Sequence, residues 1–302
     1  MSERVADAIT EMLSALSGES VEILELRAYG GGCINNAARV ISTAGGYFVK
    51  WNSDASVQTF LDEAAGLQAL RQAAGDALVV PEAIGVAGGC GGVPALLVLQ
   101  HLDRLDHGDG DSTAAENTHQ QAHLGTGLAT IHRASATHFG RARDSEPVSV
   151  SASASTEWPQ HYRDEYLLPV LGRIVQARLL SASDTELHLR LCAMLPQLLD
   201  HEPQPSLVHG DLWHGNYLPT LRGPEIVDPH AAYADRECEF GIATLFGGFG
   251  AEFWATYQRA LPLAAGWQRR NRLYQLYHLL QHHFLFGGTY PAAARATAAS
   301  YL

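Results

Sequence analysis

Residues 206–230, SLVHGDLWHGNYLPTLRGPEIVDPH, constrain the fold of this chain more than any other stretch. Two short apolar runs flank a dense polar segment, which is the pattern of buried strands joined by a loop and a hairpin. A hairpin that turns at residues 222–224 would return Asp228 towards Asp211 and Asn216. We therefore expect three oxygen-bearing side chains to converge at one point.

Carboxylate and amide oxygens suit Mg²⁺, which binds proteins through one or two carboxylates together with substrate phosphates. Phosphoryl transfer needs such a metal and a carboxylate that orients the incoming hydroxyl. HGD-x₄-N followed by VDP parallels the HRD-x₄-N and DFG pair of protein kinases, with Gly210 in place of the arginine. The spacing therefore favours Asp211, Asn216 and Asp228 as the residues that carry out phosphoryl transfer and bind the metal.

A zinc site at His209 and His214 is the alternative interpretation of the same stretch. The two histidines are not at the i, i+4 spacing of zinc pairs on a helix, and no third ligand has convincing spacing. We expect His209 to bond the loop backbone. We expect His214 to be exposed, either near a substrate or merely solvated.

A glycine-rich segment, YGGGCINNA, separates the first two of three strands predicted within residues 21–51. It is not a Walker A loop, because no Gly-Lys-Ser/Thr follows, and a dinucleotide fold would need a helix directly after the glycines. Glycines between two strands are typical of a kinase loop, where Gly31 and Gly32 would let backbone N–H groups approach phosphate oxygens. By itself the segment slightly favours the alternative, an ordinary flexible hairpin.

Lys50 lies on the strand after this hairpin, within FVKW, where a lysine either extends to solvent or serves a site. Glu63 follows within a helix predicted over residues 55–75, for which Gly75 is a plausible C-cap. In kinase-like sites a strand lysine contacts the nucleotide phosphates and a helix glutamate holds the lysine. The order of the three features favours that arrangement.

Composition limits the partners and the location of the chain. The net charge of −12 disfavours nucleic acid and anionic membranes as general partners. No run of about 18 apolar residues predicts a membrane span, and the N-terminus lacks the features of a signal peptide, so we expect a cytoplasmic protein. The cysteines are too scattered for a disulfide framework or a zinc knuckle; they are Cys33, Cys90, Cys192 and Cys238.

The character of the chain changes after the apolar run of residues 95–99. Strand patterns dominate before it and helical periodicity dominates after it, while residues 145–158 form the best loop candidate. We expect an α+β, two-lobed fold with a small antiparallel β-sheet lobe at residues 1–99. A hinge at 100–103 would lead to a larger, mainly helical lobe at 104–302.

The chain resembles the fructosamine-3-kinase (ketosamine-3-kinase) family, a relative of the aminoglycoside phosphotransferases and choline kinases within the protein-kinase-like superfamily. Matching stretches run in family order from about residue 25 to 290 and include GGGCINNA, FLDEAAGLQAL, LVHGDLWHGN, IVDP and DRECEFGIATLFGGF. The tryptophan of HGDLW and the helix LYQLYHLLQH favour the ketosamine branch. The chain departs from the family at VSVSASASTEW, where an asparagine-rich stretch is usual, and at Tyr166-Leu167, where Arg-Leu is usual.

The resemblance implies an ATP- and Mg²⁺-dependent kinase that phosphorylates a sugar hydroxyl, the 3-hydroxyl, of fructosamine- or ribulosamine-type ketoamines, which leads to deglycation. It implies Asp211 as the base, Asn216 and Asp228 as the metal ligands, and Asp235 and Arg236 as braces of the fold. The other implied site residues are Gly31, Gly32, Cys33, Lys50 and Glu63 at the phosphates, Gln100, His101 and Leu102 at the adenine, and Trp213 and His214 at the substrate.

Three questions stay open at this point. The acceptor could instead be an aminoglycoside or a choline-like alcohol. A nucleotide-binding pseudokinase is a third hypothesis, which the intact set of candidate residues disfavours. Cys33 is either a redox-sensitive thiol that could bridge two subunits, as the resemblance suggests, or a small buried hydrophobe, so both a monomer and a redox-dependent dimer remain hypotheses.

Overall fold

The computed structural model describes residues 3–29, 35–88, 93–101, 114–142 and 155–302. The predicted glycine loop at Gly31, Gly32 and Cys33 lies outside the described residues, as do Leu102 and most of the predicted loop at residues 145–158.

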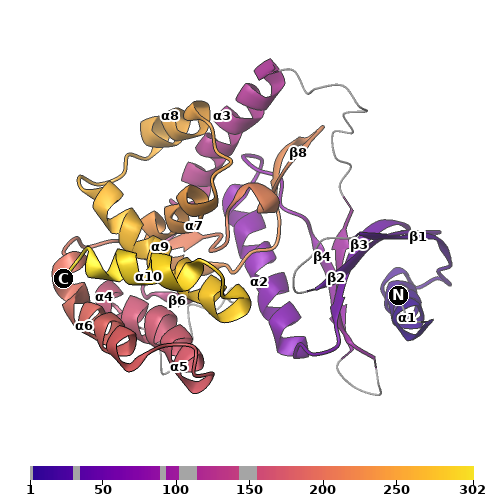
Figure 1. Ribbon diagram of the computed structural model, residues 1–302. Helices are drawn as coiled ribbons and strands as arrows, with labels where there is room; N and C mark the ends of the chain where they lie inside the picture. The colour runs from indigo at the N-terminus through magenta and orange to yellow at the C-terminus, as the bar shows by residue number, and fades with distance from the viewer. Residues whose placement is uncertain (1–2, 30–34, 89–92, 102–113, 143–154) are drawn as a thin grey trace.

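A five-stranded antiparallel sheet forms the N-terminal part (Figure 1). Its strand order is β1-β2-β3-β5-β4. It confirms the strands expected on either side of the glycine segment. The flanking helices are α1 (Glu3–Ser17) and α2 (Val57–Ala74), and the strands are β1 (Ile23–Tyr29), β2 (Asn36–Ser42), β3 (Gly45–Asn52), β4 (Ala83–Ala87) and β5 (Ala95–Gln100).

The alternation of side chains along β5 explains why both faces of the sheet are covered. Leu96 and Val98 share a core cluster with residues of α1, whereas Leu97 and Leu99 share another with residues of α2. Successive side chains of a strand point to opposite faces, so a fully apolar strand needs a cover on each side. The helix α2 begins at the cap Ser56 and ends at Gly75, whose φ of 52° favours glycine.

Helices dominate the C-terminal part, as expected (Figure 1). The main ones are α3 (Ala114–Ile131), α5 (Leu168–Gln176), α6 (Ala182–Leu198), α7 (Glu239–Phe246), α8 (Ala251–Ala260), α9 (Trp267–Phe286) and α10 (Tyr290–Ala299), with α4 (Trp158–His161) and the π-helical η1 (Tyr162–Leu167) before α5. Three short strands, β6 (Gly140–Arg141), β10 (Ala232–Ala234) and β7 (Ser206–Val208), form one sheet, and β8 (Tyr217–Thr220) and β9 (Gly223–Ile226) form the predicted hairpin.

The segment after α2 joins the two parts of the molecule. The backbone N–H of Val79 donates to the carbonyl of Pro224, and the N–H of Ile226 donates to the carbonyl of Val79, both at 3.0 Å. The apolar core is continuous there, because Phe60 of α2 and Leu128 of α3 belong to one cluster. This contact fixes the position of α2 relative to the β8–β9 hairpin. The boundaries 1–99, 100–103 and 104–302 stay a prediction.

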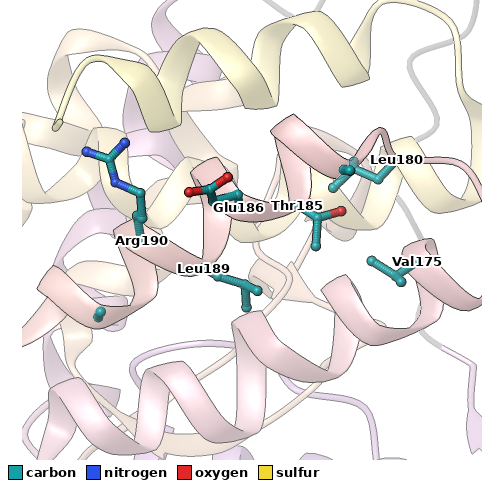
Figure 2. A pocket seen from close by; sticks show the side chains of 8 residues that line it. Val175, Leu180, Thr185, Glu186, Leu189 and Arg190 are labelled. Atoms are coloured by element: carbon teal, nitrogen blue, oxygen red, sulfur yellow. The ribbon is translucent and has the colours of Figure 1, made fainter.

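A surface groove lies between α5 and α6, lined by Val175, Leu180, Thr185, Glu186, Leu189 and Arg190 (Figure 2). It contains none of the predicted site residues. Among the residues that the structure describes, no helix is both long enough and apolar enough to cross a membrane.

Candidate active site

Lys50 on β3 is the buried cation of the site. Its Nζ lies 2.7 Å from Glu63 Oε1 on α2 and 2.5 Å from Asp228 Oδ1 after β9. The side chain is only 6 % exposed, so the alternative that it extends to solvent is wrong. Burial lowers the pKa of Lys50, but the charges of Glu63 and Asp228 outweigh burial and raise it. The amine therefore stays charged at the point where β3, α2 and the segment after β9 meet.

The pair of Asp211 and Asn216 forms the second half of the site. Asn216 Nδ2 donates to Asp211 Oδ2 and to the Asp211 carbonyl, both at 2.9 Å. The 3-10 turn η2 (His214–Asn216) places the amide opposite the carboxylate, and the N–H of Val227 donates to the Asn216 carbonyl at 3.1 Å. The hairpin thus brings Asp228 to the same place as the loop, as the sequence predicted.

The carboxyl group of Asp211 has a pKa raised to about 7. Burial is the largest cause, the bond from Asn216 opposes it, and the negative charges of Glu239 and Asp228 add to it. A carboxylate with a pKa close to neutrality is suited to accept a proton from an alcohol and to release it again. Asp211 is thus chemically distinct from the surface carboxylates of the chain.

Glu239 at the start of α7 anchors the loop that carries Asp211, and sequence reasoning missed it. Its fully buried carboxylate accepts the backbone N–H of His209 at 2.5 Å and that of Gly210 at 3.0 Å. Burial alone would raise the pKa of Glu239, but interactions with His132 and His209 outweigh burial and lower it. The only sequence signal was a glutamate inside an apolar stretch, EFGIATLF, where a buried charge needs partners.

His209 is part of the scaffold, which confirms the expectation from sequence. Its Nδ1 accepts the N–H of Asp211 at 3.3 Å, and its Nε2 lies 2.9 Å from the Val227 carbonyl, to which it donates. Burial lowers the pKa of the imidazole, so the ring is neutral. Both ring nitrogens are engaged within the protein, and the zinc interpretation has no support in this geometry.

Two backbone positions explain residue choices that the sequence left unexplained. Gly210 has a φ of 82°, and a Cβ there would overlap the His230 carbonyl, so only glycine fits where protein kinases carry arginine. Asp228 has a φ of 58°, in the left-handed region that aspartate tolerates better than most residues. Such backbone strain is typical of functional sites.

The predicted adenine segment is described only at its start. The N–H of Gln100 donates to the Glu82 carbonyl at 2.8 Å, and that of His101 donates to the Gly46 carbonyl at 3.3 Å. Both amides therefore bind within the protein, one to the residue before β4 and the other to β3.

Trp213 and His214 lie in the loop between Asp211 and Asn216, and their ring centroids are 4.5 Å apart. Trp213 is partly buried against Phe246, whereas His214 is exposed. His214 is thus exposed as expected, and no role follows from its position alone.

Residues Asp235 and Arg236 act as braces, as expected. Asp235 accepts the Tyr274 hydroxyl at 2.5 Å and pairs with His201 at 2.8 Å. Arg236 donates to the Tyr257 hydroxyl at 2.9 Å and to the Leu261 carbonyl at 3.0 Å. These contacts hold η3 (Arg236–Cys238) against α8 and α9.

Comparison with known proteins agrees with this geometry. The fructosamine kinase family model matches residues 5–302. A probable ketoamine kinase of Synechocystis sp. is 33 % identical over 291 residues, which cover 95 % of this chain and 93 % of that protein. The chloroplastic protein-ribulosamine 3-kinase of Arabidopsis thaliana is 30 % identical over 290 residues, which cover 94 % of this chain and 85 % of that protein.

Solved structures show the same fold. A crystal structure from Thermobifida fusca that is named as a fructosamine-3-kinase superposes with a TM-score of 0.78 at 28 % identity, covering 97 % of this chain and 98 % of the other. A ternary complex of aminoglycoside phosphotransferase APH(4)-Ia with AMP-PNP and hygromycin B superposes with a TM-score of 0.64 at 16 % identity, covering 97 % of each chain, which shows the kinase-like fold alone. The expected two-lobed kinase-like fold is confirmed, and the chain belongs to the fructosamine kinase family.

Proposed function

We propose that this chain transfers the terminal phosphoryl group of ATP to a sugar hydroxyl of a fructosamine- or ribulosamine-type ketoamine. The observation that carries the proposal is the meeting of two pairs, Lys50–Glu63 and Asp211–Asn216, at the Asp228 carboxylate. A buried cation beside a carboxylate of raised pKa provides both requirements of phosphoryl transfer to an alcohol, which are charge stabilisation and proton acceptance.

Asp211 accepts the proton of the attacking hydroxyl in this mechanism. Its raised pKa, about 7, makes the carboxylate a stronger base than an ordinary aspartate, and part of it is still ionised near neutral pH. The Asn216 amide donates to the Asp211 carboxylate at 2.9 Å, and Glu239 holds the loop through two backbone amides. The carboxylate is therefore already oriented when the substrate hydroxyl arrives.

The residues fit a magnesium ion by the chemistry of their donors. Asn216 uses Nδ2 for both of its bonds to Asp211, which directs its side-chain oxygen away from the carboxylate. The Asp228 side chain is 45 % exposed and offers a carboxylate. Amide and carboxylate oxygens are hard ligands of the kind that Mg²⁺ prefers. When bound there, the ion would neutralise charge on the transferred phosphoryl group.

Lys50 would contact the nucleotide phosphates. Its link to Glu63 fixes the amine from the side of α2, while its second partner, Asp228, belongs to the segment that would bind the metal. The glycine loop at Gly31, Gly32 and Cys33 would cover the phosphates, and Gln100, His101 and Leu102 would contact the adenine. These roles, the 3-hydroxyl as the acceptor, a cytoplasmic location and the Cys33 switch all stay predictions.

The relatives decide between the acceptors that the sequence left open. The ketoamine and ribulosamine names belong to proteins that are 30–33 % identical over nearly the whole chain, whereas the aminoglycoside phosphotransferase is 16 % identical. We therefore favour a ketoamine over an aminoglycoside or choline. The intact charged residues also favour an active kinase over a pseudokinase.

An acceptor screen tests the proposal. Purified protein is given ATP and Mg²⁺ with a ribulosamine, a fructosamine, an aminoglycoside or choline, and the products are identified by mass spectrometry and phosphorus NMR. We expect a phosphorylated ketoamine with the wild type and none with Asp211→Asn. Phosphorylation of choline or the aminoglycoside alone would exclude the ketoamine, and ATP binding without any acceptor turnover would support the pseudokinase.

A further inference from the structure

Five aromatic rings form a continuous row that starts at the loop carrying Asp211, residues 209–216, which we call the catalytic loop. Phosphoryl transfer itself does not require this row. We call it the aromatic strip; it consists of Trp213, Phe246, His282, Phe286 and Tyr290. The rings come from the catalytic loop, the end of α7, the last turns of α9 and the start of α10, elements that the fold brings together (Figure 1).

The rings of the strip touch one another in sequence. The Trp213 and Phe246 centroids are 5.9 Å apart, and the Phe246 and His282 centroids are 4.8 Å apart. His282 then contacts Phe286 at 5.4 Å and Tyr290 at 5.0 Å. These are the spacings of interacting aromatic pairs. The strip therefore leads without a break from the neighbourhood of Asp211 to the outer end of α9.

Exposure separates the strip from the aromatic core of the same region. Trp158, Tyr162 and Tyr274 pack in a cluster and are at most 1 % exposed. In contrast, Phe286 is 53 % exposed, and the other four rings are partly buried. Phe286 is the most open of the five rings, and Tyr290 also packs against the core. A row of partly exposed aromatic rings beside a candidate catalytic residue is typical of a binding surface.

A close approach of the backbone keeps the inner end of the strip against the catalytic loop. Gly248, just after α7, has a φ of 102°, and a Cβ there would overlap the His214 side chain. The turn that follows Phe246 therefore lies directly on the loop residue that follows Trp213. This contact sets the position of the inner two rings relative to Asp211.

His282 adds one polar group to the surface. Its Nδ1 lies 2.8 Å from the His278 carbonyl, and because a carbonyl can only accept, Nδ1 carries the hydrogen. This bond fixes the orientation of the ring within the strip. Aromatic faces suit a ligand that carries an N–H cation on an apolar chain.

We propose that the aromatic strip binds the amine-bearing part of the substrate, namely the cationic nitrogen and alkyl stem of a lysine-type amine that carries the sugar. This inference rests on the proposed function, which puts the sugar at Asp211. The nitrogen of a ketoamine lies within a few bonds of the sugar hydroxyl, so the stem leaves the catalytic residue at the inner end of the strip. Aromatic faces attract such a cation and cover its methylene groups.

The test compares two ketoamines of the same sugar, one made from methylamine and one from n-hexylamine. Both carry the cationic nitrogen, so their ratio of kcat/KM reports the stem alone. We expect the wild type to prefer the hexylamine compound, and Phe286→Ala to lower that ratio about tenfold through the KM of the hexylamine compound, the loss that matches roughly two buried methylene groups. Leu285→Ala is the matched control, since Leu285 is 50 % exposed on the same turn but is not a member of the strip, and it should leave the ratio unchanged.

Four results would overturn the inference: no preference in the wild type, a ratio that Phe286→Ala leaves unchanged, an equal loss of ratio in Leu285→Ala, or a change of oligomeric state in Phe286→Ala without a change of ratio. The last would identify the strip as a contact between copies of the chain. If the wild type phosphorylates neither ketoamine, the proposed function fails by itself. The inference is then tested by calorimetry with the 3-deoxy analogues of both ketoamines. The ratio of their affinities replaces the ratio of kcat/KM, with the same expected changes in the variants. If neither analogue binds, the inference is overturned too.

Discussion

Replacing Asp211 with asparagine should lower turnover by orders of magnitude and make the protein more stable at alkaline pH. The pKa of Asp211 rises from 3.8 in the unfolded chain to about 7 in the fold, chiefly through burial. This rise in pKa corresponds to about 4 kcal/mol by which ionised Asp211 disfavours folding. Asparagine keeps an oxygen that can accept the Asn216 amide and has no charge to bury.

The sign of this effect fixes its pH dependence. The folded state binds the Asp211 proton more tightly than the unfolded state, so the wild type loses stability as pH rises from about 4 to about 7. The Asp211→Asn variant lacks this loss. Its advantage in unfolding free energy should therefore be small near pH 4 and should approach its limit, about 4 kcal/mol, above pH 7.

Urea denaturation of both proteins without nucleotide, at about pH 4.5 and about pH 8.5, measures this difference. Turnover of the variant should fall by about 10²- to 10⁴-fold, as expected for loss of a general base, while nucleotide affinity stays within about twofold. A variant that is no more stable than the wild type at about pH 8.5 would refute the role of burial at Asp211. Near-normal turnover would refute its role as the base.

Two further substitutions test the supports of the site. Glu239→Gln turns an amide NH₂ towards one of the two backbone N–H donors that Glu239 now accepts, so it should lower the unfolding free energy by about 3 kcal/mol and also lower turnover. The exposed control Glu186→Gln should change neither quantity. Equal effects of the two substitutions would refute the role of Glu239 as the anchor of the loop. Lys50→Met leaves Glu63, 11 % exposed, without its cation and should cost about 3 kcal/mol, and adding Glu63→Gln should restore part of this loss in a double-mutant cycle. Purely additive effects on the unfolding free energy would show that Lys50 and Glu63 are not coupled. Nucleotide affinity should fall in Lys50→Met both with and without Glu63→Gln.

The amino-acid sequence alone determined the local elements of the site. The strands around the glycine segment, the helix of Glu63 with its Gly75 cap, and the β8–β9 hairpin all form where predicted. Each depends on short-range signals, namely alternation of apolar residues, turn residues and caps, which are legible without knowledge of distant contacts. The order of these elements favoured a kinase-like site, and the resemblance of the motif stretches implied the family.

Only the tertiary structure decided how these elements act on one another. The environments of Lys50 and Asp211 include groups from other parts of the chain, namely Asp228 beside Lys50 and Glu239 near Asp211. Glu239 and the aromatic strip escaped prediction because glutamate and aromatic residues on a helix are ordinary in sequence, and their meaning depends on which surface they meet. That surface is fixed by long-range packing, which no periodicity of 2 or 3.6 residues encodes.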